Sequence, residues 1–334
     1  MDRVDRQILH ALQIAPRAPF ARIAAVLGVS EQTVARRYQR LRTFGVLRIV
    51  ARPEPIRMAY TTYWTLRIGC RPGTAAALAE ALARRGDTSW ISIGAGGAEI
   101  TCQVTVHEQD PAGLLHHLPR ASNVLTFSAF QMLHRFPGRG ETDWIAAGDT
   151  LDEAQRAAFT EATPASGVAP SPGKGGARLE PADAPLLDAL ARDGRAGWAA
   201  LAEATGWSQR QVAHRVAALV ASEAIYFHLD VADAAVGIRS VANLWFTVAP
   251  ADLARVGAEL ADHAEIAFVA AFTGAANLMA STRCPDATAL YRYLTTKVAA
   301  IDGVRTVETV PQLTRVKQSH FLFANGLVRE PPAS

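Results

Sequence analysis

The helix expected over residues 31–43 carries the side chains with the clearest chemistry. Its apolar seam is Val34, Tyr38 and Leu41, and at about 100° per residue the polar side chains point away from that seam. Arginine can bind a guanine edge through two hydrogen bonds, and glutamine can do the same for adenine. The outward face consists of Gln32, Thr33, Arg36 and Arg40, with Arg37 at its border. This face predicts contacts to bases, and the border predicts contacts to phosphates.

An arginine-rich helix can also be a merely solvated surface, so the neighbouring elements decide between the two interpretations. Residues 2–14 and 20–27 have apolar side chains at helical spacing, and Gly28 ends the second of these helices. Ser30 is a suitable N-cap, and residues 46–50 are expected to form an extended wing. Three short helices with a tight turn before the third are typical of a winged helix-turn-helix and favour DNA binding. The candidate DNA-binding residues are Ser30, Gln32, Thr33, Arg36, Arg37, Arg40, Arg42, Arg48 and Arg52.

The chain repeats this pattern, because adding 178 to a position in the first half often gives the same residue type in the second. The matches include Asp5 with Asp183, Arg17 with Arg195, Gly28 with Gly206, Ser30 with Ser208, Arg37 with Arg215, Leu82 with Leu260 and Gly96 with Gly274. A period of this length exceeds that of solenoid repeats. We therefore expect a small two-part protein that has been duplicated and fused.

The two helical heads differ in charge. Residues 1–57 contain eleven arginines and four acidic residues, a formal net charge of +7, whereas residues 180–226 contain four arginines and six acidic residues, a net charge of −2. The second head is expected to fold like the first but to bind a polyanion more weakly. Whether it touches DNA at all stays open. Its candidate residues are Ser208, Arg210, Gln211, His214 and Arg215.

Each head is followed by a segment with the element order βαββαβ. The first has strands expected over 60–68, 89–93, 100–106 and 124–136 and helices over 75–85 and 111–118. The second has strands over 241–248, 266–272, 278–282 and 304–317 and helices over 251–263 and 286–301. This order predicts a four-stranded antiparallel sheet with both helices on one face. Two such sheets packed face to face would cover each other's open side.

A glycine-bearing turn precedes the third strand of each sheet, as GAGGAEI over 94–100 and FTGAANL over 272–278. Glycine permits positive φ and lets a ligand approach the backbone, yet an unoccupied hairpin turn fits the same residues. The candidate effector-binding residues are Gly94, Gly96, Gly97, Glu99, Gly274, Ala276 and Asn277. The glycine spacing does not match a dinucleotide-binding fingerprint.

Composition excludes several classes of protein. Of the 334 residues, 49% are hydrophobic and 19% are charged, which is enough apolar material for several cores. No signal peptide or membrane-spanning segment is evident, so we expect a cytoplasmic protein. Cys70, Cys102 and Cys284 form no CxxC pair, and His116 and His117 point to different faces of one helix, so we expect no metal site. No HExxH, GxSxG or P-loop appears, and no cofactor is expected.

Several of these residues resemble the Lrp/AsnC family of feast/famine transcriptional regulators. The similarity lies in residues 5–9 (DRQIL), 25–30 (AVLGVS), 45–47 (GVL), in Val34, Arg36, Arg37 and Leu41, and in the turn with Gly96 and Glu99. The resemblance covers nearly the whole chain, twice. It implies a winged DNA-binding domain followed by a ferredoxin-like, RAM-type domain that binds amino acids or related molecules near the turn. The chain departs from the family in being a tandem fusion and in lacking the family's usual aspartate at the turn.

Two alternatives come from other classes. Siroheme decarboxylases resemble this architecture and can also be fused in tandem, but their active sites contain histidines and arginine around the second and third strands. In this chain those strands contain no histidine before His107. The acidic second head would also suit a small-molecule sensor that binds no DNA. We expect no enzyme, and we expect duplex DNA, a small effector and further copies of the chain as partners, in a dimer of pseudo-dimers or higher.

The expected domains follow the repeat. They are a helix-turn-helix domain over 1–52, an effector and oligomerisation domain over 58–137, a linker with a short helix over 138–179, a second helix-turn-helix domain over 180–230, a second effector domain over 238–323 and a tail over 324–334.

Overall fold

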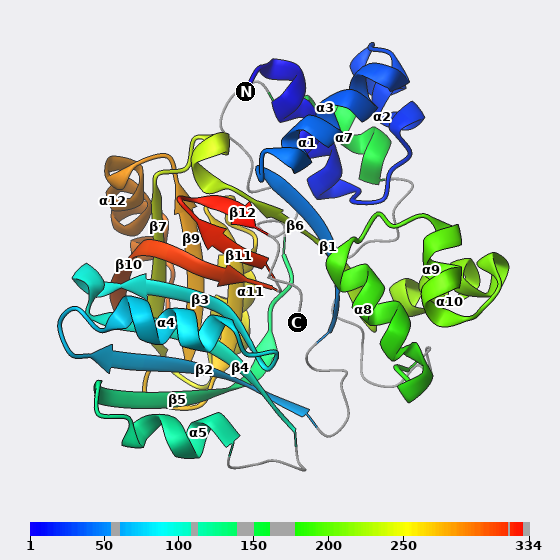
Figure 1. Ribbon diagram of the computed structural model, residues 1–334. Coiled ribbons are helices and arrows are strands. Elements are labelled where there is room, and N and C mark those ends of the chain that lie inside the picture. Colours follow the sequence, from blue (N-terminus) through cyan, green and yellow to red (C-terminus); the bar gives the residue numbers. More distant parts are fainter. Residues whose placement is uncertain (55–60, 108–112, 139–149, 161–177, 320, 330–334) are drawn as a thin grey trace. The chain divides into compact units, whose positions relative to one another are not determined.

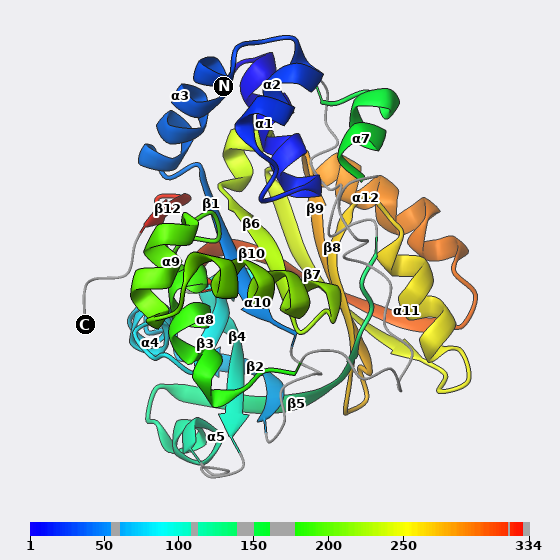
Figure 2. The ribbon, with the colours of Figure 1, turned by 90° about the vertical axis from the view of Figure 1, so that its right-hand side faces the viewer.

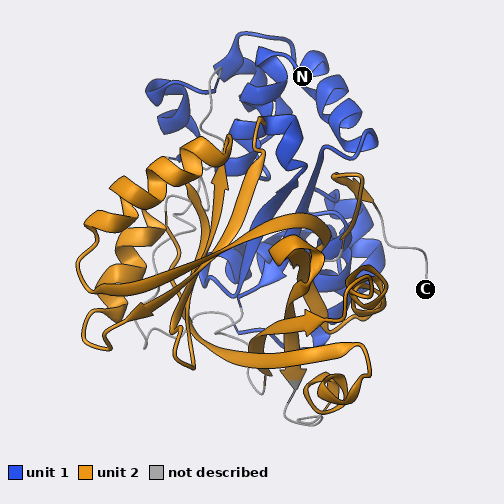
Figure 3. Cartoon of the chain, turned by 90° about the vertical axis from the view of Figure 1, so that its left-hand side faces the viewer, with its two compact units in different colours: residues 1–58, 145–236 blue, residues 59–144, 237–334 orange. Residues whose placement is uncertain are grey.

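The computed structural model describes residues 1–54, 61–107, 113–138, 150–160, 178–319 and 321–329. The expected flexible linker PASGVAPSPGKGGAR, apart from its final arginine, lies outside these residues. The chain divides into two compact units, shown in different colours in Figure 3. Unit 1 consists of residues 1–58 and 145–236, and unit 2 consists of residues 59–144 and 237–334. Both helical heads therefore belong to unit 1, and both βαββαβ segments belong to unit 2.

The first head contains the helices expected from its apolar spacing. These are α1 (Arg3–Ile14), α2 (Phe20–Leu27) and α3 (Glu31–Thr43), followed by the strand β1 (Leu47–Pro53) (Figure 1). The Asp2 side chain and Asp5 cap α1 reciprocally, and Gly28 ends α2 with a φ of 66°. Buried Ile8, Leu12 and Ile23 join the seam residues of α3 in the core of this head.

The second head repeats this arrangement. It contains η4 (Pro181–Asp183), α8 (Ala184–Arg192), α9 (Trp198–Thr205), α10 (Gln209–Ala221), the strand β6 (Ile225–Val231) and η5 (Asp233–Val236). Its core is formed by Leu186, Leu190, Leu201, Val212 and Leu219, and Ala51 of the first copy packs against it. The cores of the two heads therefore meet at β1.

The extended segments of the two heads pair with each other. β1 and β6 form a two-stranded antiparallel ribbon, visible in Figure 2, that runs from the pair Leu47 and Val231 to the pair Pro53 and Ile225. At its centre Val50 pairs with His228, which is the equivalent position of the second copy. The ribbon therefore has the register of a local twofold axis. The wing expected after α3 exists, but its partner strand comes from the other copy, which the sequence pattern did not indicate.

The short helix expected within the linker is α7 (Glu153–Thr160), and it packs on the first head. Phe159 is fully buried, and the backbone N–H of Leu151 donates to Nδ1 of buried His10 at 3.1 Å. Arg22 donates to the carbonyl of Ala158, and the Gln155 amide donates to that of Val26. The segment after the first sheet thus returns to unit 1.

Unit 2 contains the two expected βαββαβ segments. The first consists of β2 (Thr61–Cys70), α4 (Ala75–Ala83), β3 (Thr88–Gly94), β4 (Glu99–His107), α5 (Gly113–His117) and β5 (Val124–Arg135), with η2 (Ala95–Gly97) and η3 (Leu118–Arg120). The second consists of β7 (Ser240–Val248), α11 (Leu253–Ala261), β8 (Ile266–Phe272), β9 (Leu278–Cys284), α12 (Ala287–Thr296), η6 (Val298–Ala300) and β10 (Val304–Gln318). A hairpin of β11 (Phe321–Ala324) and β12 (Leu327–Arg329) extends the sheet beyond β10.

The two sheets are joined at their edges as well as through their faces. β5 pairs with β8, and β10 pairs with both β7 and β3, so eight strands follow one another in a closed ring. The two joints differ in register: Met132 pairs with Phe272, whereas Gly94, the equivalent of Phe272, pairs with Gln312 instead of with Val310. This shift of two residues keeps each strand's side chains on the same face.

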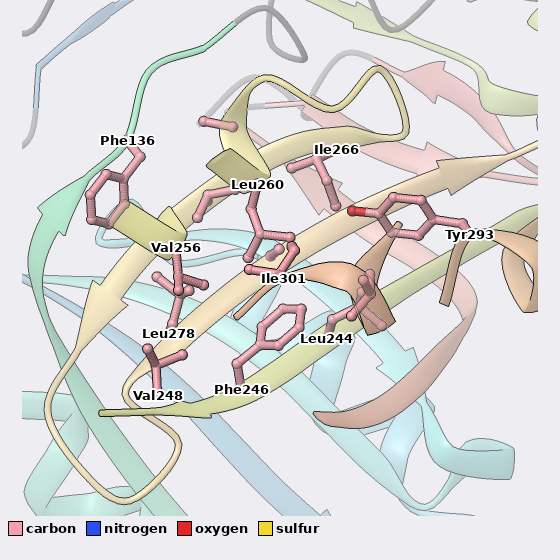
Figure 4. Packing of buried hydrophobic residues seen from close by; sticks show 14 of the residues in the cluster. Phe136, Leu244, Phe246, Val248, Val256, Leu260, Ile266, Leu278, Tyr293 and Ile301 are labelled. Atoms are coloured by element: carbon pink, nitrogen blue, oxygen red, sulfur yellow. The ribbon is translucent and has the colours of Figure 1, made fainter. Parts of the chain in front are cut away.

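Alternate faces of each sheet have separate cores. Leu244 and Phe246 of β7 point toward Val256 and Leu260 of α11, and Phe136 from the end of the first copy packs beside this helix (Figure 4). Trp245, between those two β7 residues, lies on the other face and packs with Phe130 of β5 at a ring-centroid distance of 5.2 Å. Side chains of both copies therefore form the core between the sheets.

Candidate functional sites

The outward face of α3 is well exposed. The Ser30 hydroxyl accepts a hydrogen bond from the Thr33 backbone N–H at 3.1 Å, which fixes the start of the helix. Gln32, Arg36 and Arg40 are exposed, and Thr33 is half-buried with its hydroxyl 2.8 Å from that of Ser30. Among the described residues, none makes a hydrogen bond or ion pair with the guanidinium of Arg36. A long cation without an internal partner suits contact with another molecule.

Arg37 and Arg40 have internal partners. Arg37 donates to Asp2 at 2.6 Å and to Asp5 at 2.9 Å, and Arg40 donates to the other Asp5 oxygen at 2.7 Å. Hydrogen bonds to Asp2 and Asp5 raise the pKa of Arg37. Because the Asp5 side chain is only 1% exposed, these arginines neutralise a buried carboxylate. The phosphate contact expected of Arg37 therefore competes with a structural role.

The remaining basic candidates of the first head lie around the end of α3. Arg42 forms an ion pair with Asp193 at 2.8 Å, and Arg48 donates to the carbonyls of Arg42 and Leu47. Arg52 is half-buried on β1, where it pairs with Tyr226 across the ribbon. Arg42 and Arg48 thus stabilise the junction of the helix, the ribbon and the second head.

The second head has the same frame with a different outward face. Ser208 and the Gln211 side chain cap α10 reciprocally, and Arg215 donates to both oxygens of Asp183 at 2.8 and 2.6 Å. Arg210 and His214 are exposed. Asp183 and Arg215 are the equivalents of Asp5 and Arg37, so this ion pair is common to both heads. All four residues match at the offset of 178, but the offset alone does not indicate that they pair.

A second repeated pair was missed by reasoning from the sequence. Arg17 donates to the carbonyls of Gly194 and Ala196, and its equivalent Arg195 donates to those of Pro16 and Ala18. Each guanidinium also lies over an aromatic ring of the other head, Arg17 over Trp198 at 4.6 Å and Arg195 over Phe20 at 4.5 Å. The two arginines therefore join the heads by the same twofold relation as the ribbon.

The first glycine turn lies beside a cluster of charged side chains. Gly96 and Gly97 have positive φ, and a Cβ on Gly94 would lie 2.8 Å from the carbonyl oxygen of Pro311. Glu99 accepts two hydrogen bonds from Arg67, at 3.1 and 2.8 Å, and Arg67 donates two more to Glu308 of the second copy at 2.7 and 2.8 Å. The hydrogen bonds from Arg67 hold the pKa of Glu308 below its ordinary value.

The second glycine turn is built differently. Both ends of the Asn277 amide bind the backbone of Val248 at 2.9 Å, so its side chain closes the end of β7. A Cβ on Gly274, whose φ is 104°, would lie 2.9 Å from the ring of Phe130, and Ala276 is half-buried against the same core. This turn is occupied by side chains of the protein itself.

The two turns have diverged at equivalent positions. Arg67, Glu99 and Glu308 of the first turn correspond to Trp245, Asn277 and Phe130 of the second, and Arg67 lies over the Trp245 ring at 5.2 Å. The first turn therefore offers charged groups that can bind a polar ligand, and the second offers aromatic ones.

Other kinds of site received no support from the part of the chain that the structure describes. There, no cluster of His, Cys, Asp or Glu could hold a metal ion, and no helix is both long and apolar enough to cross a membrane. Cys70, Cys102 and Cys284 are free and buried, and burial raises the pKa of Cys102 to about 12.

Known proteins resemble this chain in sequence over both kinds of domain. The AsnC-type helix-turn-helix domain matches residues 1–42 and 182–220, and the Lrp/AsnC ligand-binding domain matches residues 241–321. An uncharacterised HTH-type transcriptional regulator of Pyrococcus furiosus is 31% identical over 107 residues, 32% of this chain and 72% of the relative. A similar regulator of Pyrococcus abyssi is 31% identical over 109 residues, 32% of this chain and 69% of the relative.

A solved structure also resembles this chain in fold. A crystal structure of the siroheme decarboxylase NirDL, in complex with an iron-uroporphyrin III analogue, superposes with a TM-score of 0.57 over 95% of this chain and 93% of that one. The sequence identity is 11%, so the likeness is one of fold.

Proposed function

Because the chain belongs to the Lrp/AsnC family of helix-turn-helix transcriptional regulators, we propose that it binds duplex DNA through α3 and that a small molecule bound in unit 2 changes this binding. The observation that carries the proposal is the exposed Arg36 beside Gln32 on a capped helix whose frame is fixed by Asp5. Gln32, Thr33 and Arg36 would contact base edges, as would Arg40, whose side chain is 50% exposed although it pairs with Asp5. The backbone at Ser30 would contact a phosphate.

The partners of Arg37, Arg42 and Arg48 narrow this assignment. Each of these three arginines binds a carboxylate or a backbone carbonyl of unit 1. We therefore propose that they hold the reading helix in place and do not contact DNA directly. Arg36 then becomes the residue whose loss should change sequence preference, since it has no competing partner among the described residues.

The experiment is a salt titration of binding to random and selected duplexes, read by fluorescence anisotropy. Arg36→Ala should weaken binding to the preferred duplex by roughly 1–3 kcal/mol and reduce its advantage over random DNA. Arg192→Ala is the matched control, because Arg192 is exposed on α8 in unit 1 and carries the same charge. Equal losses from both variants, or no binding by the intact protein, would contradict the proposal.

We propose that the effector is a zwitterion, such as an amino acid, held near the first glycine turn. Arg67 would bind the ligand carboxylate through two hydrogen bonds in exchange for those it donates to Glu308, and Glu308, whose side chain is 55% exposed, would then accept from the ammonium group. The test is a panel of amino acids in thermal unfolding, where a ligand at 100 times its Kd adds about 2.7 kcal/mol to stability. The shift should be lost in Arg67→Ala and kept in Arg71→Ala, an exposed control. A shift equally large in Arg67→Ala would place the ligand elsewhere.

We further propose that the chain is a regulator without the activity of the enzyme that shares its fold. The likeness to siroheme decarboxylase is one of backbone arrangement, and β3 and β4 carry no histidine before His107. Titration with an iron-uroporphyrin III analogue, followed by visible absorption, separates the two functions. A saturable spectral shift would favour the enzymatic alternative.

A further inference from the structure

We propose that a single chain recognises a non-palindromic DNA site, made of two unlike half-sites in inverted orientation, with α3 reading one and α10 reading the other. This inference rests on the proposed DNA binding. It goes further by assigning specificity to the second head and by fixing the symmetry of the site.

The two heads of unit 1 are related by a local twofold axis. In the ribbon of β1 and β6, Leu47 pairs with Val231 and Pro53 pairs with Ile225. Leu47 and Ile225 are equivalent positions of the two copies, as are Pro53 and Val231. The hydrogen bonds that Arg17 and Arg195 each donate to the backbone of the other head follow the same twofold relation. An axis that relates the two heads also relates α3 to α10, and two twofold-related recognition helices match half-sites that are inverted with respect to each other.

Both helices begin with the same cap and share one ion pair with the first helix of their head. Ser30 and Ser208 are N-caps of helices with thirteen residues each, and Asp5 with Arg37 corresponds to Asp183 with Arg215. The glycines before the two helices, Gly28 and Gly206, have φ values of 66° and 72°. The second head therefore keeps the machinery that orients a reading helix.

The outward faces of α3 and α10 carry different side chains. Gln32, Arg36 and Arg40 correspond to Arg210, His214 and Ala218. Arg210 and His214 are exposed, as are Gln32 and Arg36. A bidentate guanine contact is available to Arg36 on one helix and to Arg210, one turn earlier, on the other. Equivalent base positions thus meet different side chains, and the half-sites differ in sequence.

The test is selection of bound duplexes from a random-sequence library with the full chain at fixed salt, followed by sequencing. The expected consensus contains two inverted half-sites of different sequence. Arg36→Ala should remove base preference in one half, and the double variant Arg210→Ala/His214→Ala in the other. Each should weaken binding to the selected site by roughly 5- to 150-fold.

A gain-of-symmetry variant makes the test sharper. Arg210→Gln/Gln211→Thr/His214→Arg/Ala218→Arg gives α10 the outward residues of α3, and Asp183 lies at the position of Asp5, which pairs with Arg40. Its consensus should become a palindrome of the Arg36-dependent half-site. Far-ultraviolet circular dichroism melting checks that the variant folds.

The outcomes separate the inference from its premise. A perfect palindrome selected by the unchanged protein would mean that two chains each supply α3, and a single half-site would mean that α10 does not read DNA; either result overturns the inference and leaves DNA binding intact. Absence of any enriched sequence would instead contradict the proposed function.

Discussion

Arg17 and Arg195 occupy equivalent positions of the two copies, and each donates to backbone carbonyls on both sides of the other. Arg17 reaches Ala196 at 3.1 Å as well as Gly194, and Arg195 reaches Pro16 at 2.7 Å and Ala18 at 2.9 Å. Burial lowers the pKa of both guanidinium groups, yet each stays charged because the ordinary pKa of arginine lies far above neutral pH. Charge-assisted hydrogen bonds to backbone carbonyls, donated by each arginine to the opposite head, therefore join the two heads.

Removing either arginine should loosen unit 1. Arg17→Ala and Arg195→Ala are each expected to lower its unfolding free energy by roughly 1.5–3 kcal/mol, the usual range for hydrogen bonds to a charged group. Urea denaturation followed by circular dichroism measures the loss, and Arg192→Ala is the exposed control. A change of less than about 0.5 kcal/mol in both variants would show that the exchange adds little.

The ion pair of Asp183 and Arg215 should make stability depend on acid pH. Burial alone would raise the pKa of Asp183, but hydrogen bonds from Arg215 and from the Glu180 backbone lower it below its ordinary value of 3.8. A lowered folded-state pKa contributes stability that is present above about pH 4 and is lost as the pH falls through the folded value.

Asp183→Asn should therefore be less stable than the unchanged protein by about 2 kcal/mol at pH 7. The difference should shrink below about pH 4, where the carboxylate of the unchanged protein takes up its proton. Urea midpoints at pH 7 and pH 3 give the comparison. A difference that is constant with pH would contradict a charge-dependent role.

The docking of α7 should depend on Phe159. Its side chain is fully buried and lies near Arg22, with the guanidinium carbon 5.8 Å from the ring centre. Phe159→Ala is expected to cost roughly 3–5 kcal/mol of local stability. Hydrogen exchange should then accelerate in residues 153–160 and stay unchanged in α8 to α10. Thr160→Ala, on the exposed side of the helix, should leave the exchange of both segments unchanged.

The thiols should be unreactive in the native protein. Cys70, Cys102 and Cys284 are buried, and burial raises the pKa of Cys284 to about 11 and of Cys102 to about 12. At pH 8 few thiolates are present to attack a disulfide reagent. Ellman's reagent should therefore react with all three only after denaturation. A fast native reaction would indicate that one of these thiols is exposed in solution.

The sequence predicted elements well where local signals agreed. The bounds of α3 were anticipated because Ser30 caps its start and Gly45, with a φ of 67°, follows its end. β8 was anticipated from its apolar run between turn residues. Capping and periodicity act within a few residues, so one sequence suffices to read them.

Partners across long stretches of chain were beyond that reasoning. A helical wheel places Arg37 at the border of the reading face, but only the fold brings Asp5 to it. In the same way, nothing local to β1 indicates that its hydrogen bonds go to β6. The backbone N–H and C=O groups of a strand can form hydrogen bonds with any extended partner, and tertiary contacts determine which strand this partner is.

The candidate ligand turns show the same limit. Glu99 and Asn277 are equivalent polar positions in the sequence, yet one binds Arg67 and the other binds the backbone of Val248. The divergence comes from residues 67 and 245, far from either turn along the chain. Their equivalence is visible in the repeat, but their proximity is not.

Val50 and His228 face each other at the centre of the ribbon, and they are the same position of the two copies. In an assembly of identical subunits, a residue on the axis meets itself, so a branched aliphatic side chain there would face its own duplicate. Gene fusion removes that restriction, and each half of the ribbon can accept mutations alone. The two halves of this chain can therefore diverge as the unlike subunits of a heterodimer do. Because they belong to one polypeptide, they are always made in equal amounts.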